Sequence, residues 1–387
     1  MKKIINQRGA LKFIILLGIV SLFGDITYEG ARSITGPFLF TLGASATVVG
    51  FVAGFGEFIG YGLRLLSGYI SDKTRGYWIM MFVGYGLILS IPLLSLANYW
   101  EIAAILIVLE RMGKAIRSPA RDTILSHATK QIGRGFGFGI HEALDQIGAI
   151  IGPLIFSFVF YLKGGYREGF FILWIPAILT LLVLIIARKK YPLPTRLETS
   201  AIKTDNGKLP RIFWLYTLFT FLSVTGYANF QLISYHFKIK SVISNTQIPI
   251  FYAVAMGIDA VVALIIGKVY DRVGLISLIS IPLFTILVPI LSFSYDYNFA
   301  LIGIIIWGAV MGMQETIMRA AIADLTPIAR RGLAYGIFNT MYGVSWFMGS
   351  ALMGILYDFS VKYVIIFAII MELTSIPILI KTVKNFS

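Results

Sequence analysis

The chain contains a series of long apolar runs, and these runs limit its possible folds more than any other feature. Twelve such runs are present, at 11–40, 46–70, 78–96, 101–118, 135–161, 169–188, 211–237, 248–268, 275–293, 299–322, 332–357 and 361–381. A helix of about 20 residues crosses the ~30 Å hydrocarbon layer of a bilayer. Lipid satisfies no backbone hydrogen bonds, so only helices and closed barrels span it, and these runs lack the alternating pattern of barrel strands. We therefore predict an all-α membrane protein with twelve transmembrane helices.

The scarcity of charge supports this class and argues against several others. Charged residues make up 13% of the 387 residues, against about 25% in soluble domains. The net charge of +14 is spread between the apolar runs, so we expect no nucleic-acid partner. Cysteine is absent, the three histidines lack metal-ligand spacing, and no nucleotide-binding or catalytic arrangement is recognisable. We expect no metal, no cofactor, no catalytic residues and no enzymatic activity.

The distribution of Lys and Arg predicts how the chain is oriented. Counted with the span ends that they flank, 24 of these residues lie on the side of the N-terminus and 5 on the opposite side. Lys114, Arg117 and Arg121 are counted among the 24, at the end of the run 101–118. Cytoplasmic loops carry the excess of positive charge. We therefore predict a multi-pass protein of the cell membrane with both termini in the cytoplasm.

An internal repeat predicts that the chain consists of two similar halves. Gly68–Lys73 (GYISDK) matches Gly267–Arg272 (GKVYDR) at an offset of 199 residues, and a second set of arginine and glycine matches follows at an offset of 197. The longest polar stretch, 188–210, lies between the halves. Parallel repeats are a known transporter architecture, with the substrate site at their interface. We predict two pseudo-symmetric six-helix bundles, 1–187 and 211–387, joined by a cytoplasmic linker.

The repeated stretch resembles the loop 2–3 signature of the major facilitator superfamily, which reads glycine, three residues, aspartate, a basic residue, any residue and glycine. The corresponding positions are Gly68, Asp72, Lys73 and Arg75 in the first copy and Gly267, Asp271, Arg272 and Gly274 in the second. Arg75 stands where the family prefers glycine. The resemblance implies that these positions form a conformational latch, which stabilises one state of the transport cycle.

Two other stretches carry the same resemblance. Residues 110–122 are similar to the arginine motif of span 4, and 139–153 are similar to the span 5 motif associated with antiporters. The resemblance covers essentially the whole chain and points to bacterial and archaeal members of the drug/proton antiporter type. It implies a monomer with a cavity lined mainly by spans 1, 4, 7 and 10, which opens to one side of the membrane at a time.

Ionisable residues inside the spans are the candidates for proton coupling, because each costs roughly 2.5–3.5 kcal/mol at the centre of a span. The candidates are Asp25, Glu29, Arg32, Arg111, Glu142 and Asp145. The three span 1 residues share one helix face, and two acids against one base leave a spare carboxyl suited to reversible protonation. The alternative is a structural network of ion pairs between helices.

Polar and aromatic residues at similar depth are the candidates for substrate binding. They are Tyr28, Glu110, Tyr227, Asn229, Gln231, Glu315, Arg319, Asn339, Tyr342 and Trp346. Aromatic and amide groups with few charges suit a mostly apolar ligand held by a few directed contacts. The alternative is ordinary packing, and for Glu315 and Arg319 an internal ion pair. Glu372, in the last span, is expected to have a structural role on an outer helix.

These residues favour a secondary active transporter that works by alternating access. We expect its partners to be a small-molecule substrate, protons or another coupling ion, and the lipid bilayer. Proton-coupled export (efflux by an antiporter) of a small amphiphilic or cationic organic molecule is the preferred hypothesis. A proton-coupled symporter that takes up a metabolite is the alternative; Arg32, Arg111 and Arg319 would then suit an anion. A non-transporting membrane receptor is a hypothesis of a different class.

Overall fold

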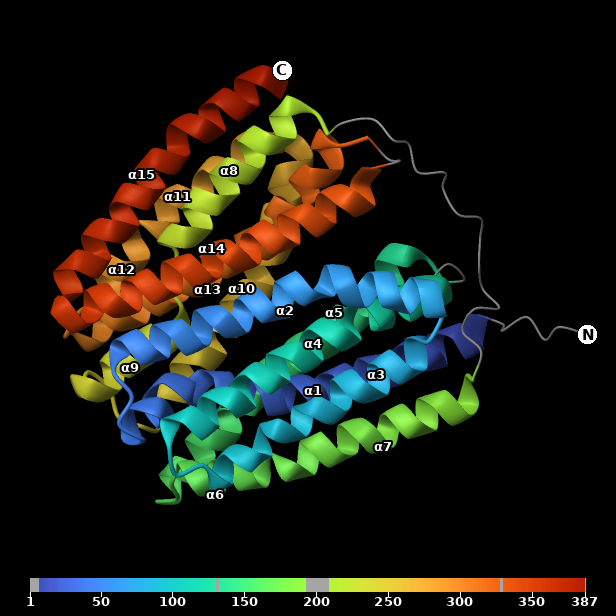
Figure 1. Ribbon diagram of the computed structural model, residues 1–387, viewed down its shortest axis with the longest axis horizontal. Coiled ribbons are helices and arrows are strands. Elements are labelled where there is room, and N and C mark those ends of the chain that lie inside the picture. Colours follow the sequence, from blue (N-terminus) through green and yellow to red (C-terminus); the bar gives the residue numbers. More distant parts are fainter. Residues whose placement is uncertain (1–6, 130–131, 193–208, 328–329, 387) are drawn as a thin grey trace, which may run out of the picture. The chain divides into compact units, whose positions relative to one another are not determined.

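The computed structural model describes residues 7–129, 132–192, 209–327 and 330–386, and these residues form helices without any strand. The first half contains α1 (Gln7–Thr41), α2 (Ala46–Thr74), α3 (Tyr77–Gly86), η1 (Leu87–Ser90), η2 (Pro92–Leu96), α4 (Trp100–Thr129), α5 (Arg134–Tyr161), α6 (Tyr166–Ile172) and α7 (Trp174–Lys190). The second half contains α8 (Arg211–Gly226), α9 (Phe230–Ile239), α10 (Gln247–Val273), η4 (Gly274–Ile279), α11 (Ser280–Thr285), α12 (Leu287–Ser292), α13 (Tyr297–Leu325), α14 (Arg331–Phe359) and α15 (Val361–Phe386) (Figure 1).

The twelve predicted spans coincide with this helical architecture. Each predicted range lies on one helix or on consecutive helical pieces, which confirms the all-α prediction. Within the described residues, eight helical segments are long and apolar enough to cross a membrane, and one of them, Gln247–Ser292, contains two predicted spans. The remaining predicted spans lie on α4, which charged residues interrupt, on α8 with α9, and on α14.

The chain divides into two compact units, and the division cuts through two helices. Unit 1 comprises Met1–Arg32 and Leu63–Ala201, and unit 2 comprises Ser33–Gly62 and Ile202–Ser387. The end of α1 and the first half of α2 therefore belong with the second half of the sequence. Most of the predicted linker, 193–208, lies outside the described residues. The sequence-based boundaries at 187 and 211 remain a prediction.

In unit 1, glycines of α5 allow it to pack closely against α1. A Cβ atom on Gly148 would lie 3.2 Å from the Cβ of Asp25, and one on Gly30 would lie 3.0 Å from the carbonyl oxygen of Gly152. Small residues at this spacing let helix backbones approach. The contact sets α5 beside the polar face of α1, and this juxtaposition brings the candidate residues of the two helices together.

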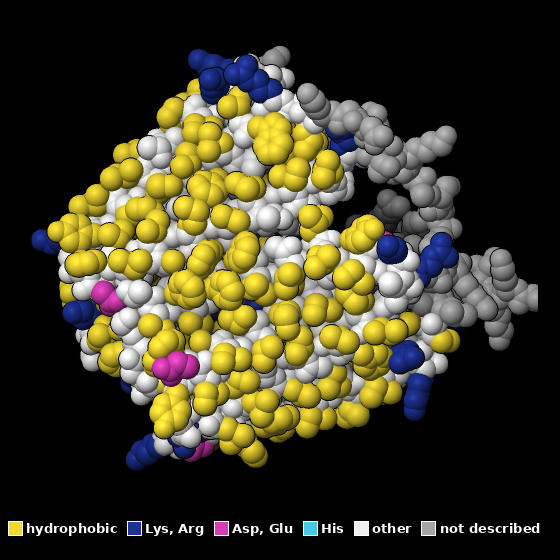
Figure 2. All heavy atoms as spheres, viewed as in Figure 1, with side chains coloured by type: hydrophobic (Ala, Val, Ile, Leu, Met, Phe, Trp, Pro, Cys, Tyr) yellow, Lys and Arg dark blue, Asp and Glu magenta, His cyan; other side chains and the backbone are white. Residues whose placement is uncertain are grey.

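In unit 2, α8 and α15 lie side by side along their lengths (Figure 1). The first half of α2 packs on α14 through small residues: a Cβ atom on Gly54 would lie 2.8 Å from the Cβ of Ser350 and 2.9 Å from the Cα of Phe347. Hydrophobic side chains cover the helices seen in the space-filling view, whereas Lys and Arg gather near helix ends (Figure 2). This distribution suits helices that are surrounded by lipid.

Candidate functional site

A stripe of charged residues on α4 faces the polar side of α1 in unit 1. Glu110, Lys114, Arg117 and Arg121 recur at intervals of four, three and four residues, so they lie on one helix face. The Arg117 guanidinium lies 3.0 Å from the Glu110 carboxylate, and both side chains are almost fully buried. The Lys114 ammonium lies 4.0 Å from Glu29 of α1. The stripe therefore neutralises acids on both helices.

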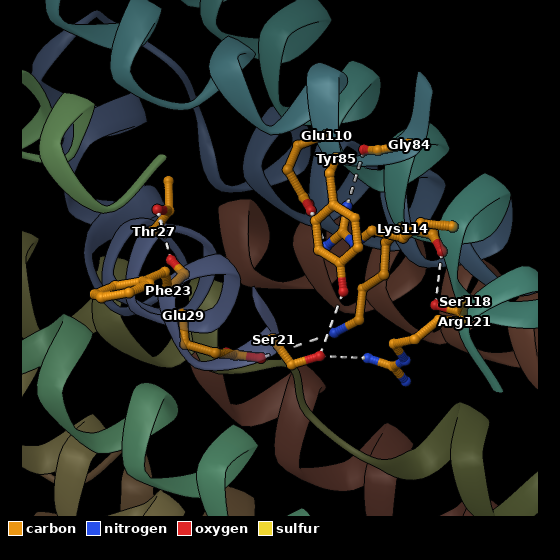
Figure 3. A network of polar contacts seen from close by, with 11 residues as sticks. Ser21, Phe23, Thr27, Glu29, Gly84, Tyr85, Glu110, Lys114, Ser118 and Arg121 are labelled. Carbon is orange, nitrogen blue, oxygen red and sulfur yellow. Dashed lines mark hydrogen bonds and ion pairs between the residues drawn. The ribbon is translucent and has the colours of Figure 1, made fainter. Parts of the chain in front are cut away.

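Ser21 of α1 joins three helices to this stripe. Its hydroxyl oxygen lies 3.3 Å from the hydroxyl of Tyr85 on α3 and 3.0 Å from Nε2 of His141 on α5. Arg121 donates a hydrogen bond of 3.1 Å to the same oxygen. Figure 3 shows Tyr85 and Arg121 converging on Ser21. A single α1 hydroxyl thus connects α3, α4 and α5 in one polar network.

Tyr28, one helical turn before Arg32, is surrounded by positive charge. The guanidinium of Arg111 lies 4.1 Å from the Tyr28 ring centroid, the ammonium of Lys114 lies 4.3 Å from it, and the guanidinium of Arg32 lies 5.9 Å from it. Arg32 also forms an ion pair of 3.7 Å with Glu29. Cations are attracted to the face of an aromatic ring. The structure therefore places Tyr28, Glu29 and Arg32 of α1 together with Arg111 of α4.

Two carboxyl groups meet where α1 packs against α5. Asp25 packs on Gly148, and Asp145 lies three residues before Gly148 on the same face of α5. The Asp25 and Asp145 carboxyls interact electrostatically, and both residues are half-buried. Two carboxyls at this separation cannot both carry a full charge at low cost, so the pair is suited to hold one proton between them.

The charge balance of the cluster differs from the one that span 1 alone suggests. The acids are Asp25, Glu29, Glu110, Asp122 and Asp145, and the cations are Arg32, Arg111, Lys114, Arg117 and Arg121. Sequence reasoning left Lys114, Arg117 and Arg121 out of the site because it counted them with the positive charges at the cytoplasmic end of the span. The helix continues to Thr129, and the regular spacing of these residues is the signal that could have found them.

The remaining proton-coupling candidate and the latch residues lie outside this cluster. Glu142 is exposed on α5. Near the end of α2, the Tyr77 hydroxyl donates to Asp72 at 3.5 Å, and the Lys73 ammonium lies 5.7 Å from the Tyr69 ring centroid. Arg75 has a φ of 53°, and Gly274, its counterpart in the repeat, has a φ of 63°. Both copies of the repeat thus end at a residue with a positive φ, and Gly274 combines it with a ψ of −144°. Gly267, Asp271 and Arg272 lie in the last turns of α10.

Four of the predicted substrate residues line one pocket in unit 2. The pocket is lined by Tyr61, Gln314, Glu315, Arg319, Phe338, Asn339 and Tyr342, and these side chains leave no room for a water-sized molecule between them. The Tyr342 hydroxyl donates to Gln314 at 3.0 Å. Sites for drug-sized ligands occupy about 300–1,000 Å³. In this conformation the lining side chains therefore leave no space for such a ligand, and binding would require them to move apart.

The other predicted substrate residues of unit 2 are engaged in packing. Tyr227 stacks on Trp307 at 5.6 Å, and its hydroxyl donates to the Trp307 carbonyl at 2.8 Å. Trp346 meets Tyr227 edge-on at 5.5 Å. The Asn229 side chain accepts from the backbone N–H of Leu232 and caps α9. Gln231 is buried on the same helix, where its backbone carbonyl meets Gly36 of α1.

The chain resembles known proteins over nearly its full length. The family model described as Major Facilitator Superfamily matches residues 15–314 and again 243–385. An uncharacterised protein of Mycobacterium tuberculosis is 40% identical over 376 residues, which cover 95% of this chain and 92% of that protein. The solved nucleoside transporter NupG (D323A mutant) has a TM-score of 0.73 and 14% identity, over 97% of this chain and 100% of that one.

A shorter match has a name that refers to drug resistance. The multidrug resistance protein MdtH of Photorhabdus laumondii is 32% identical over 123 residues, which cover 32% of this chain and 30% of that protein. The family match extends over both halves of the chain, and the helical fold agrees with it. The protein is a multi-pass membrane transporter that belongs to the major facilitator superfamily.

Proposed function

We propose that this transporter couples the movement of protons to the export of a small amphiphilic or cationic organic molecule. The observation that supports coupling is that close packing of α1 on α5 at Asp25 and Gly148 brings Asp25 and Asp145 to the same seam. A pair that holds one proton carries one negative charge, and loss of that proton adds a second. The five cations of the cluster lower the cost of that second charge, so both protonation states are accessible.

Antiport follows if substrate and proton compete for this pair. A cationic substrate favours the deprotonated pair, and a proton favours release of the substrate. The name of the drug-resistance relative supports the export direction. The unit 2 pocket offers aromatic rings, amides and the Glu315 and Arg319 side chains to an amphiphilic molecule. Asp72 and Asp271, in the repeated loop, are proposed to act as the conformational latch. Both termini are proposed to lie in the cytoplasm.

Purified protein in liposomes with a pH dye trapped inside tests this proposal. Ligands that raise the melting temperature of the protein are added outside, to wild type, to Asp25→Asn and to Glu101→Gln. Glu101 lies exposed at the start of α4 and serves as the matched control. Internal alkalinisation in wild type and Glu101→Gln, but not in Asp25→Asn, supports antiport. Internal acidification indicates symport, and ligand entry without proton movement contradicts proton coupling.

Uptake of an anionic metabolite is a second candidate, favoured by the three cations that lie around the Tyr28 ring. An anion would be attracted by Arg32, Arg111 and Lys114, which surround Tyr28. The variant Arg319→Gln separates the two functions at the unit 2 pocket. Loss of ligand binding in this variant favours an anionic substrate, and retained binding favours a cationic one.

A further inference from the structure

One acidic residue of α15 is buried, and it lies far along the sequence from the candidates described above. Glu372 has 0% of its surface exposed, although the sequence suggested an outer helix. It faces α8, where the Ser223 hydroxyl donates a hydrogen bond of 2.9 Å to its Oε2 atom. Unit 2 therefore contains a membrane-buried carboxyl group, held in place by a neutral donor from the neighbouring helix.

The second carboxyl oxygen points at the end of α8. Oε1 of Glu372 has no hydrogen-bond partner among the described residues. A Cβ atom on Gly226 would lie 2.8 Å from this oxygen, so the bare Cα of Gly226 is what makes room for it. Gly226 is the last residue of α8. A buried polar atom with no partner in this state calls for an explanation.

The chain is not helical at this point. Tyr227 and Asn229 have extended backbone angles, and α9 begins at Phe230. The C-terminal end of a helix has unsatisfied carbonyl groups and a partial negative charge of about −0.5. An ionised Glu372 beside the end of α8 would be repelled by these carbonyls. In other transporters, interrupted helices of this kind bind coupling ions at their carboxyl ends.

The surroundings of Glu372 offer little to balance a negative charge. The Ser223 hydroxyl of α8 donates to its carboxyl group, and the Ser375 hydroxyl of α15 donates to its backbone carbonyl. The elements packed on α15 carry their charged residues near their ends, namely Arg211 on α8 and Arg331 and Asp358 on α14. On α15 itself, Lys362, Lys381 and Lys384 lie toward the two ends. A carboxylate without a paired cation is expensive to bury, whereas a neutral acid is not.

We propose that Glu372 is a second proton-binding site, formed by the carboxyl group, Ser223 and the carboxyl end of α8 at Gly226. The proton on this carboxyl removes the repulsion between Glu372 and the end of α8, so protonation favours the helix break in the form described. Movement of α9 relative to α8 would change the environment of the carboxyl and release the proton. The site is separate in sequence and unit from Asp25 and Asp145, and the inference does not depend on the proposed export function.

Infrared spectroscopy of the purified protein tests this assignment, because a protonated carboxyl has its own carbonyl stretching band. Wild type, Glu372→Gln, Asp25→Asn and the exposed control Glu101→Gln are compared at neutral pH. We expect a carboxylic acid band of wild type to be lost in Glu372→Gln and kept in the other two variants. No difference between wild type and a folded Glu372→Gln would overturn the proposal.

Two further measurements make the test decisive. If Glu372→Gln fails to fold, Ser223→Ala retains the acid and removes its hydrogen-bond donor; a shift of the carboxylic acid band supports the site, and an unchanged spectrum overturns it. Replacement of choline chloride by sodium chloride at constant pH tests the bound ion. A band insensitive to sodium supports proton binding, and a band abolished by sodium overturns it in favour of a sodium site. Neither outcome depends on whether Asp25 couples transport.

Discussion

Asp358, near the end of α14, binds the first turn of α2 through Thr47. One carboxylate oxygen of Asp358 accepts from the Thr47 backbone N–H at 2.9 Å and from the Thr47 hydroxyl at 2.6 Å, and the other accepts from the backbone N–H of Ala46 at 3.2 Å. Helix N-termini present free N–H groups and a partial positive charge, which a carboxylate satisfies. Two helices almost the whole chain apart in sequence are thereby joined within unit 2.

This contact predicts that Asp358→Ala destabilises the protein. The loss of a helix cap costs about 0.5–2 kcal/mol, and here it also removes a bond between α2 and α14. Chemical unfolding in detergent measures the change. Ser45→Ala is the matched control, because the Ser45 hydroxyl accepts from Val48 and caps α2 locally. If the two variants lose equal stability, the link between helices contributes nothing beyond local capping.

The positive φ angles of Arg75 and Gly274 predict opposite effects of exchanging their residue types. An L-residue in this conformation costs roughly 1–2 kcal/mol, and glycine does not. Gly274→Ala should therefore destabilise the protein by about 1 kcal/mol. Arg75→Gly should be neutral or stabilising, since the relief of strain offsets the greater freedom of glycine in the unfolded chain. Thermal unfolding of both variants checks this, and a stable Gly274→Ala contradicts it.

The fold was predictable because membrane burial leaves few options for a long apolar run, and the helices follow the predicted ranges closely. The sequence could not show where the two compact units divide, since the division at Arg32 and Gly62 depends on packing between distant segments. The break after Gly226 was also missed. The local sequence features that indicate this break are a glycine and the helix-capping residue Asn229. A hydropathy profile does not detect such features.

The candidate site was only partly predictable for the same reason. The spacing of Asp25, Glu29 and Arg32 was enough to place them on one face of α1. The partners of these residues come from α4, where Lys114 and Arg121 are 25% and 20% exposed. A hydropathy profile marks such residues as the end of a span. Their spacing of three and four residues instead indicates one polar helix face, which continues past the end of the apolar run.

The pair formed by Glu110 and Arg117 predicts strong non-additivity between substitutions. Their side chains are 1% and 3% exposed, and removal of one partner from a buried ion pair costs about 3–5 kcal/mol. Glu110→Gln and Arg117→Gln should each destabilise the protein, and the double variant should recover much of the loss. Unfolding measurements on the four proteins of this cycle give the coupling. If the single losses simply add, the two groups do not act as a pair.

The contact between Asp25 and Asp145 predicts how pH affects the binding of a cationic ligand. Protonation removes negative charge from the pair, so affinity should fall as the pH is lowered through the range in which the pair takes up its proton. A single competing proton weakens binding by up to about tenfold per pH unit. Titration of a thermal-shift ligand at several pH values measures this dependence. Asp25→Asn should flatten the profile, and Glu101→Gln should keep it. A profile that is equally steep in Asp25→Asn would assign the competing proton to another group.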